Sequence, residues 1–149
     1  MDSERPAELP PEKPKHRHVS LRREETGRYT ITNARGGTLS VGGSEDDFTA
    51  VELLLSAIAA CSSIDVDYVT GRRAQPKAFD VDVDAEKVAD EKGNHLDDIV
   101  MTFRVAFPDG DGGDAARRLL PDIVRKSHER LCTVSRTIIL GTDITVRTA

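Results

Sequence analysis

Tryptophan is absent from this sequence of 149 residues, and aromatic side chains are limited to four phenylalanines and two tyrosines. We therefore expect an aliphatic core. The length is that of one domain of ordinary size. Cysteine is also scarce, because the chain has only Cys61 and Cys132. In a reducing compartment these two are not expected to form a permanent structural disulfide, whereas a transient or catalytic pairing remains open.

Long hydrophobic runs are missing too. No stretch approaches the roughly 18 apolar residues that a membrane-spanning helix needs, and the opening MDSERPAELPPEKPKHRH lacks the apolar centre of a signal peptide. We therefore expect a cytoplasmic protein without a membrane partner. Its 21 basic residues are outnumbered by 26 acidic ones, which gives a net charge of −5. This balance argues against a general nucleic-acid-binding surface.

The first 17 residues differ in composition from the rest of the chain. They contain four prolines among charged residues and almost no apolar side chains. Such a segment cannot bury enough surface to offset the entropy lost on ordering. The sequence therefore predicts a mobile tail over residues 1–17 and one domain over residues 18–149, without internal repeats.

Three short runs with β-strand composition follow the tail, at residues 18–24, 27–33 and 37–42, and turn signals rich in glycine separate them. This pattern predicts an antiparallel meander. A helix is predicted next, because Thr49 and Glu52 have the spacing of a capping box, in which each side chain bonds the other residue's backbone N–H. Apolar residues at helical spacing extend this helix to about residue 69.

Alternating apolar and charged residues predict two antiparallel strands at 79–85 and 99–107, joined by the polar stretch ADEKGNHLDD. A second helix is expected over about 115–131. Asp114 is its predicted N-cap, and Pro121 is expected to kink the helix or divide it.

The end of the chain is predicted to return to β structure. Leu131 is expected to face inward from the second helix, and residues 137–140 and 143–147 are expected to form one more strand around Gly141. The resulting order is β-β-β-α-β-β-α-β. With helices gathered over antiparallel sheets, this is an α+β fold.

The two cysteines can be interpreted as structural residues or as chemically active ones. Each is consistent with a small buried core residue, or the two could be a redox pair, provided that the sulfurs meet in the fold. A reactive Cys61 needs a nearby cation to lower its pKa. Asp65, one turn further along the helix, would raise that pKa if it is ionised and close. The cation must therefore come from elsewhere, and Arg28 and Arg35 are candidates.

Two other residues have alternative roles. His128 precedes Cys132 by about one helical turn, so that it could polarise the thiol or join both cysteines at a metal ion, although the spacing matches no standard metal motif. An ordinary, partly exposed histidine is the simpler interpretation. Glu52 is fully accounted for by the capping box, and a catalytic role is the alternative.

Taken together, the segments FTAVELLLSAIAACSSIDVDYV and SHERLCTVSRTI resemble the OsmC/Ohr family. The resemblance covers roughly residues 18–149. It consists of a helix with Glu-Leu-Leu ahead of Ala-Ala-Cys, and of a second cysteine that opens a Cys-x-x-Ser stretch after a helix. The predicted order of elements also agrees with that family.

The resemblance implies an interlocked homodimer that reduces organic hydroperoxides in oxidative-stress defence, without a bound cofactor. Cys61 would be the peroxidatic thiolate and Cys132 the resolving thiol, and an external dithiol, often on a lipoylated protein, would reduce their disulfide. An arginine would hold Cys61 as a thiolate, with Arg35 preferred and Arg28 as the alternative. A glutamate, here Glu52, would orient that arginine.

The sequence departs from the well-understood peroxidases at the position of this glutamate. They carry it ten residues before the first cysteine, where this chain has Val51, and Glu52 is displaced around the helix by about 100°. The segment Cys-Thr-Val-Ser also replaces Cys-Pro-x-Ser. The run CSSIDV is similar to the less characterised OsmC-like branch, so a non-catalytic protein that binds a small molecule or an electrophile, or that senses redox state, is the alternative function. A purely structural dimer with inert thiols is a third hypothesis.

Overall fold

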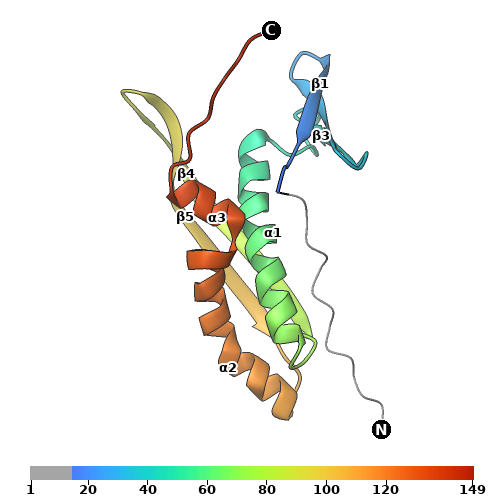
Figure 1. Ribbon diagram of the computed structural model, residues 1–149, viewed down its shortest axis with the longest axis vertical. Coiled ribbons are helices and arrows are strands. Elements are labelled where there is room, and N and C mark those ends of the chain that lie inside the picture. Colours follow the sequence, from blue (N-terminus) through green and yellow to red (C-terminus); the bar gives the residue numbers. More distant parts are fainter. Residues whose placement is uncertain (1–14) are drawn as a thin grey trace. The chain divides into compact units, whose positions relative to one another are not determined.

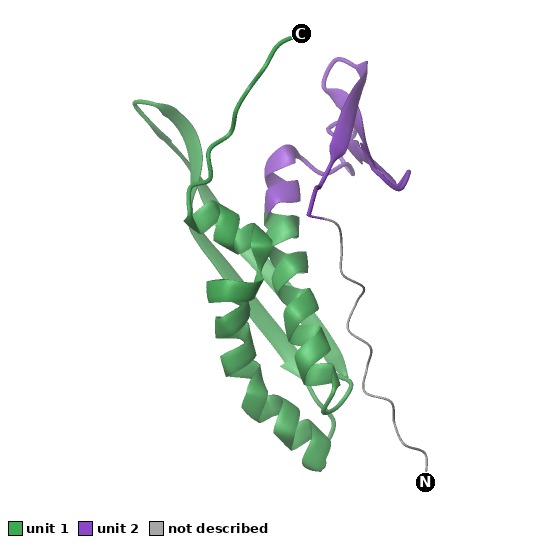
Figure 2. Ribbon diagram, viewed as in Figure 1, with its two compact units in different colours: residues 1–7, 55–149 green, residues 8–54 purple. Residues whose placement is uncertain are grey.

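The computed structural model describes residues 15–149, so that most of the predicted tail, residues 1–14, lies outside the described part of the chain. The described residues form two compact units, 15–54 and 55–149, which are coloured separately in Figure 2.

The first unit contains the predicted antiparallel meander (Figure 1). Its strands are β1 (Val19–Glu25), β2 (Arg28–Asn33) and β3 (Thr38–Val41), in the order β1-β2-β3. Gly27 and Gly36 have positive φ values of 77° and 89° in the two turns, a conformation that glycine adopts without steric cost. The turn signals in the sequence therefore predicted this sheet correctly.

Helix α1 (Ala50–Gly71) begins with the predicted capping box. The Thr49 backbone N–H donates to Glu52 Oε1 at 3.2 Å, and the Glu52 backbone N–H donates to Thr49 Oγ1 at the same distance. These two bonds satisfy donors that a helix N-terminus otherwise leaves without an intrahelical partner. The residues that α1 buries most deeply recur every four positions, at Ile58, Ser62, Val66 and Thr70.

The second unit is built on a long hairpin of β4 (Ala78–Asp90) and β5 (Gly93–Ala106). The predicted alternation is confirmed along β4, where apolar residues are half-buried and the aspartates between them are exposed. The stretch ADEKGNHLDD was predicted to connect the two strands. This prediction is wrong, because most of the stretch belongs to the strands themselves and only residues 91–92 lie between them. The turn is tight because Asp90 Oδ1 accepts hydrogen bonds from the backbone N–H groups of Lys92 and Gly93 at 2.8 and 3.1 Å.

Three helical segments follow, of which the first two lie where one helix was predicted over about 115–131. These are α2 (Asp111–Lys126), the π-helical turn η1 (Ser127–Leu131) and α3 (Thr133–Ile139). In Figure 1, α1, α2 and α3 lie on one face of the β4–β5 hairpin, the layering of an α+β fold. This face carries the apolar side chains of the hairpin, among them Phe79 and Phe103, whose rings meet edge to face at 6.2 Å.

Two predictions about the second helix are corrected, the N-cap at Asp114 and the inward orientation of Leu131. Its N-cap is Gly110, without a side-chain cap, and Asp114 lies one turn inside the helix, where its Oδ1 pairs with Arg117 at 2.6 Å. Pro121 lies within α2 and does not divide it. The helix changes geometry later, at Ser127, and Leu131 is 49% exposed because η1 rotates the residues that follow α2.

The predicted C-terminal strand is wrong. Residues 137–139 belong to α3, and residues 142–149 have no regular secondary structure. The run of β-branched residues favours a strand locally, but the hydrogen bond that caps α3 at Cys132 favours the helix. Among the described helices, none is long and apolar enough to cross a membrane.

The capping box gives a direct test of helix α1. We expect Thr49→Ala to lower the free energy of unfolding by about 1 kcal/mol, because the Glu52 backbone N–H loses its acceptor. Urea unfolding followed by circular dichroism measures this loss. Thr49→Ser is the matched control, since it keeps the hydroxyl and should stay close to wild type. Equal stability of the Ala and Ser variants would contradict the role of the cap.

Candidate functional site

The fold brings the two cysteines together. Cys61 lies on α1 and is half-buried, whereas Cys132 lies between η1 and α3 and is fully buried. Both are free thiols, and they lie close enough for each to shift the pKa of the other. The sequence could not establish this contact, which is the first condition for a redox pair.

The π-helical turn determines where Cys132 lies. Its backbone N–H donates to the Ser127 carbonyl oxygen at 2.8 Å, an i→i+5 bond in place of the usual i→i+4 bond. Cys132 then takes an extended conformation, with φ −72° and ψ 104°, and becomes the N-cap of α3. In that position its sulfur accepts a hydrogen bond from the Ser135 backbone N–H at 3.3 Å.

The surroundings of Cys61 favour its protonated form. Burial raises the pKa of this thiol above the ordinary value of 9.0, and the interaction with Cys132 raises it further. Backbone N–H groups of Val134 and Thr133 donate toward the sulfur and lower the pKa, but by less. None of these groups is a cation, so the cation that a reactive Cys61 needs is not among its strongest influences.

The surroundings of Cys132 have the opposite effect. Burial raises the pKa of this thiol, but the side chain and backbone N–H of Ser135, the Ser62 hydroxyl and the Cys61 thiol together lower it below 9.0. Ser62 is 1% exposed, and its hydroxyl has no hydrogen-bond partner among the described residues, so that it acts on Cys132 as a nearby dipole rather than through a formed hydrogen bond. Of the two thiols, Cys132 is therefore the more acidic.

Asp65 does not have the effect on Cys61 that its position in the helix suggested. Its Oδ2 accepts a hydrogen bond from the buried Ser127 hydroxyl at 2.7 Å, and this bond ties α1 to the first residue of η1. The groups with the strongest effects on the Cys61 pKa come instead from residues 132–134. Ser127 was missed in the sequence, because nothing in its neighbourhood distinguishes it from a surface serine.

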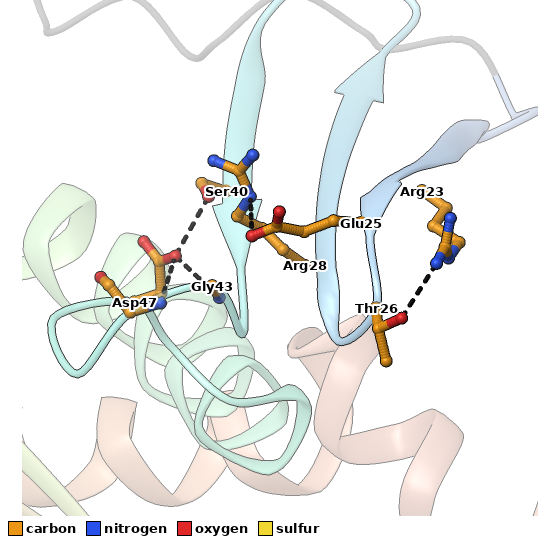
Figure 3. Close-up of polar contacts among 8 residues, drawn as sticks. Arg23, Glu25, Thr26, Arg28, Ser40, Gly43 and Asp47 are labelled. Atoms are coloured by element: carbon orange, nitrogen blue, oxygen red, sulfur yellow. Dashed lines mark hydrogen bonds and ion pairs between the residues drawn. The ribbon is translucent and has the colours of Figure 1, made fainter.

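The predicted arginines belong to the first unit. The Arg28 Nε pairs with Glu25 Oε1 at 3.4 Å beside the turn at Gly43, and Figure 3 shows this pair at the end of the meander. Arg35 lies in the β2–β3 turn, where its backbone N–H donates to Asn33 Oδ1 at 2.9 Å. Their roles at Cys61 stay predictions, as does the orienting role of Glu52.

His128 is not among the groups that most strongly shift the pKa of Cys61 or Cys132. It is exposed, and it lines a cavity together with Arg125 and Ser135. Within residues 15–149, no three histidine, cysteine or carboxylate side chains are grouped so that they could hold a metal ion. The structure thus gives no support to the metal interpretation of His128, Cys61 and Cys132.

Comparison with known proteins agrees with this fold. Uncharacterized proteins of Mycobacterium tuberculosis and Mycobacterium bovis are 32% identical over 126 residues, which is 83% of this chain and 90% of theirs. An OsmC-like protein of unknown function from Vibrio cholerae superposes with a TM-score of 0.69 at 12% identity, over 82% of this chain and 92% of its own.

A solved structure from Legionella pneumophila is described as an organic hydroperoxide resistance protein OsmC, a predicted redox protein and a regulator of sulfide bond formation. It superposes with a TM-score of 0.60 at 15% identity, over 85% of this chain and 91% of its own. The family model described as OsmC-like protein matches residues 43–147, which include α1, the hairpin and both cysteines. This chain belongs to the OsmC-like family.

Proposed function

We propose that this protein reduces organic hydroperoxides through Cys61 and Cys132 and so takes part in oxidative-stress defence. The observation that carries the proposal is the contact between these two thiols, which come from separate helical segments. The description of the Legionella protein as an organic hydroperoxide resistance protein supports the same chemistry. A homodimer, as the family resemblance implies, is part of this proposal.

Two thiols supply both electrons of the reaction. The Cys61 thiolate attacks the distal oxygen of the hydroperoxide, the O–O bond breaks, and the alkoxide leaves with a proton as an alcohol. Cys61 is then a sulfenic acid. The Cys132 thiolate attacks this sulfur, a disulfide forms, and the hydroxyl leaves with a proton as water. An external dithiol, such as the lipoyl group of a protein, reduces the disulfide by thiol–disulfide exchange.

The two roles follow from access and from acidity. Cys61 is the more exposed thiol and is therefore assigned to meet the hydroperoxide. Cys132 is fully buried beside it, and its lowered pKa makes its thiolate available to attack the sulfenic acid. Because the pKa of Cys61 is raised, this thiol needs an activating cation. We assign that role to Arg35, with Arg28 as the alternative, and the orienting role to Glu52.

A second function is favoured by the raised pKa of Cys61. A thiol that stays protonated near neutral pH reacts slowly with peroxides. The same site would then bind a small molecule or an electrophile without turnover, or sense redox state. Val51, at the position where the peroxidases carry glutamate, also favours this alternative.

The peroxidase proposal is tested by turnover. We expect the purified protein to consume cumene hydroperoxide when dihydrolipoamide is supplied, and we expect Cys61→Ser to lose this activity. Cys132→Ser is the matched control at the neighbouring sulfur. It should still react once and leave a sulfenic acid on Cys61, which a dimedone adduct detects by mass spectrometry. Full activity in Cys61→Ser would contradict the proposal.

The unequal acidity of the thiols is tested by titration. Thiolate absorbance should rise in two steps, one below pH 9.0 from Cys132 and one above it from Cys61. We expect Cys132→Ser to remove the lower step. Cys61→Ala should move that step upward, because Cys132 loses a hydrogen-bond donor.

The lowered pKa of Cys132 also makes the free energy of unfolding depend on pH. The folded state binds fewer protons at this thiol, so its contribution is largest above the unfolded pKa and is lost as the pH falls through the folded pKa. Wild-type protein should therefore gain stability relative to Cys132→Ser as the pH rises toward 9.0. A single titration step for both thiols, at or above pH 9.0, would contradict this assignment.

A further inference from the structure

Ser62 carries a buried hydroxyl that the fold leaves without a hydrogen bond. It follows Cys61 on α1, and only 1% of its surface is exposed. Within residues 15–149 its Oγ has no hydrogen-bond partner. Most buried polar groups in folded proteins are hydrogen-bonded, because water no longer solvates them. A hydroxyl of this kind beside two thiols therefore points to a use that the resting structure does not fill.

Thr70 shows what a buried hydroxyl on this helix does when its role is structural. It belongs to the same buried face of α1, and its Oγ1 donates to the Val66 carbonyl oxygen at 2.8 Å. Serine and threonine within helices commonly bond the carbonyl four residues earlier in this way. For Ser62 that acceptor would be the Ile58 carbonyl oxygen, but this bond is not formed. The Ser62 proton is therefore available to another acceptor.

The face of α1 that carries Ser62 lies against the segment that carries Cys132. Asp65, three residues after Ser62, accepts a hydrogen bond from the Ser127 hydroxyl at 2.7 Å. The Ser127 carbonyl oxygen in turn accepts the Cys132 backbone N–H at 2.8 Å. Cys132 is fully buried, and the Ser62 hydroxyl is near enough to lower the pKa of its thiol. These contacts place the hydroxyl beside the Cys132 sulfur.

The strength of a hydrogen bond from Ser62 to this sulfur depends on the charge of the sulfur. Cys132 is a free thiol in the structure, and a neutral thiol is a weak acceptor. A thiolate accepts charge-assisted hydrogen bonds, which are about twice as strong as neutral ones. A serine hydroxyl also rotates to suit its acceptor. Ionisation of Cys132 thus creates the partner that the Ser62 hydroxyl lacks.

We propose that the Ser62 hydroxyl donates a hydrogen bond to Cys132 whenever this sulfur is a thiolate, and that it thereby joins the Ser135 backbone N–H in stabilising the negative charge. This stabilisation belongs to the folded protein and needs no substrate. Only its role in turnover rests on the proposed function. There the same bond stabilises Cys132 before it attacks the sulfenic acid of Cys61, and again when it leaves the disulfide.

The charged side chains nearby do not take the place of Ser62. The titratable residues on the helical segments around Cys132 are Asp65 on α1, Arg125 on α2, His128, Glu129 and Arg130 on η1, and Arg136 on α3. Asp65 bonds Ser127, and all the others except Arg136 are exposed. None of them is among the groups that most strongly shift the pKa of Cys132, where Cys61 is the titratable one.

Thiolate absorbance in a Cys61→Ala background tests this donor, because Cys132 is then the one cysteine left in the sequence. We expect Ser62→Ala to move the Cys132 step further upward by about one pH unit, since a hydrogen bond to a charged group is lost. Ser63→Ala is the matched control. Ser63 is the next residue of α1 and lines a different cavity, together with Phe79 of β4. This variant should leave the step in place.

The pH dependence of stability separates a donor to the thiolate from a structural hydroxyl. Because Ser62 has no formed hydrogen bond and alanine favours helix, Ser62→Ala should be at least as stable as its parent below the Cys132 step. Above that step it should be less stable, because the folded parent holds the Cys132 proton less tightly. Thr70→Val loses a formed hydrogen bond and should be less stable at every pH. Urea unfolding measures these differences.

Turnover gives a further readout under the proposed function. After one equivalent of cumene hydroperoxide at neutral pH, we expect Ser62→Ala to convert the Cys61 sulfenic acid to the disulfide about threefold more slowly than wild type. The Cys132 thiolate is then about tenfold scarcer, but its higher basicity makes it the better nucleophile and restores part of the rate. Above the Cys132 step of the variant, the two proteins should no longer differ in this direction.

The outcomes separate this donor from the proposed function. An unchanged Cys132 step in Ser62→Ala overturns the donor, as does an equal shift in Ser63→Ala or a loss of stability at every pH. A shifted step with disulfide formation at the wild-type rate overturns the role in turnover. A shifted step in a protein that does not react with the hydroperoxide confirms the donor and overturns the peroxidase instead.

Discussion

The arrangement of this site depends on the first turn of α3, a helix of only seven residues. The backbone N–H groups at the start of a helix have no partner within the helix. Here that of Ser135 donates to the Cys132 sulfur, and those of Thr133 and Val134 lower the pKa of Cys61. The start of α3 therefore lies against both sulfurs, beside the middle of α1.

The π-helical turn makes this contact possible. A regular continuation of α2 would place each following residue about 100° further around the axis, whereas the i→i+5 bond at Ser127 adds one residue to the turn before Cys132. The hydroxyl of the same serine bonds Asp65 on α1. Ser127 thus fixes where Cys132 lies in space after α2, and it ties this segment to α1, the helix that carries Cys61. Such turns are frequently found at functional sites.

Local signals in the sequence predicted most of the elements and identified the two cysteines, but could not establish that these cysteines lie together. Thr49 and Glu52 identified the start of α1, and alternating residues identified β4 and β5, because each pattern requires only near neighbours. The contact between Cys61 and Cys132 depends on how α3 packs against α1, which no short window contains. The predicted last strand failed for a related reason. Its β-branched residues favour strand, but a cysteine at the N-cap followed by Ser135 three positions later forms a helix start that the sequence interpretation overlooked.

The unequal acidity of the two thiols also decides how a disulfide between them would open. In thiol–disulfide exchange the sulfur with the lower pKa is the better leaving group. The donors around Cys132 would stabilise the departing thiolate, while Cys61 is the half-buried sulfur that an incoming thiol can reach. Under the proposed function, both factors would direct the reductant to Cys61. The mixed disulfide with an electron-donating protein would then form on α1, and Cys132 would remain inside the fold throughout the cycle.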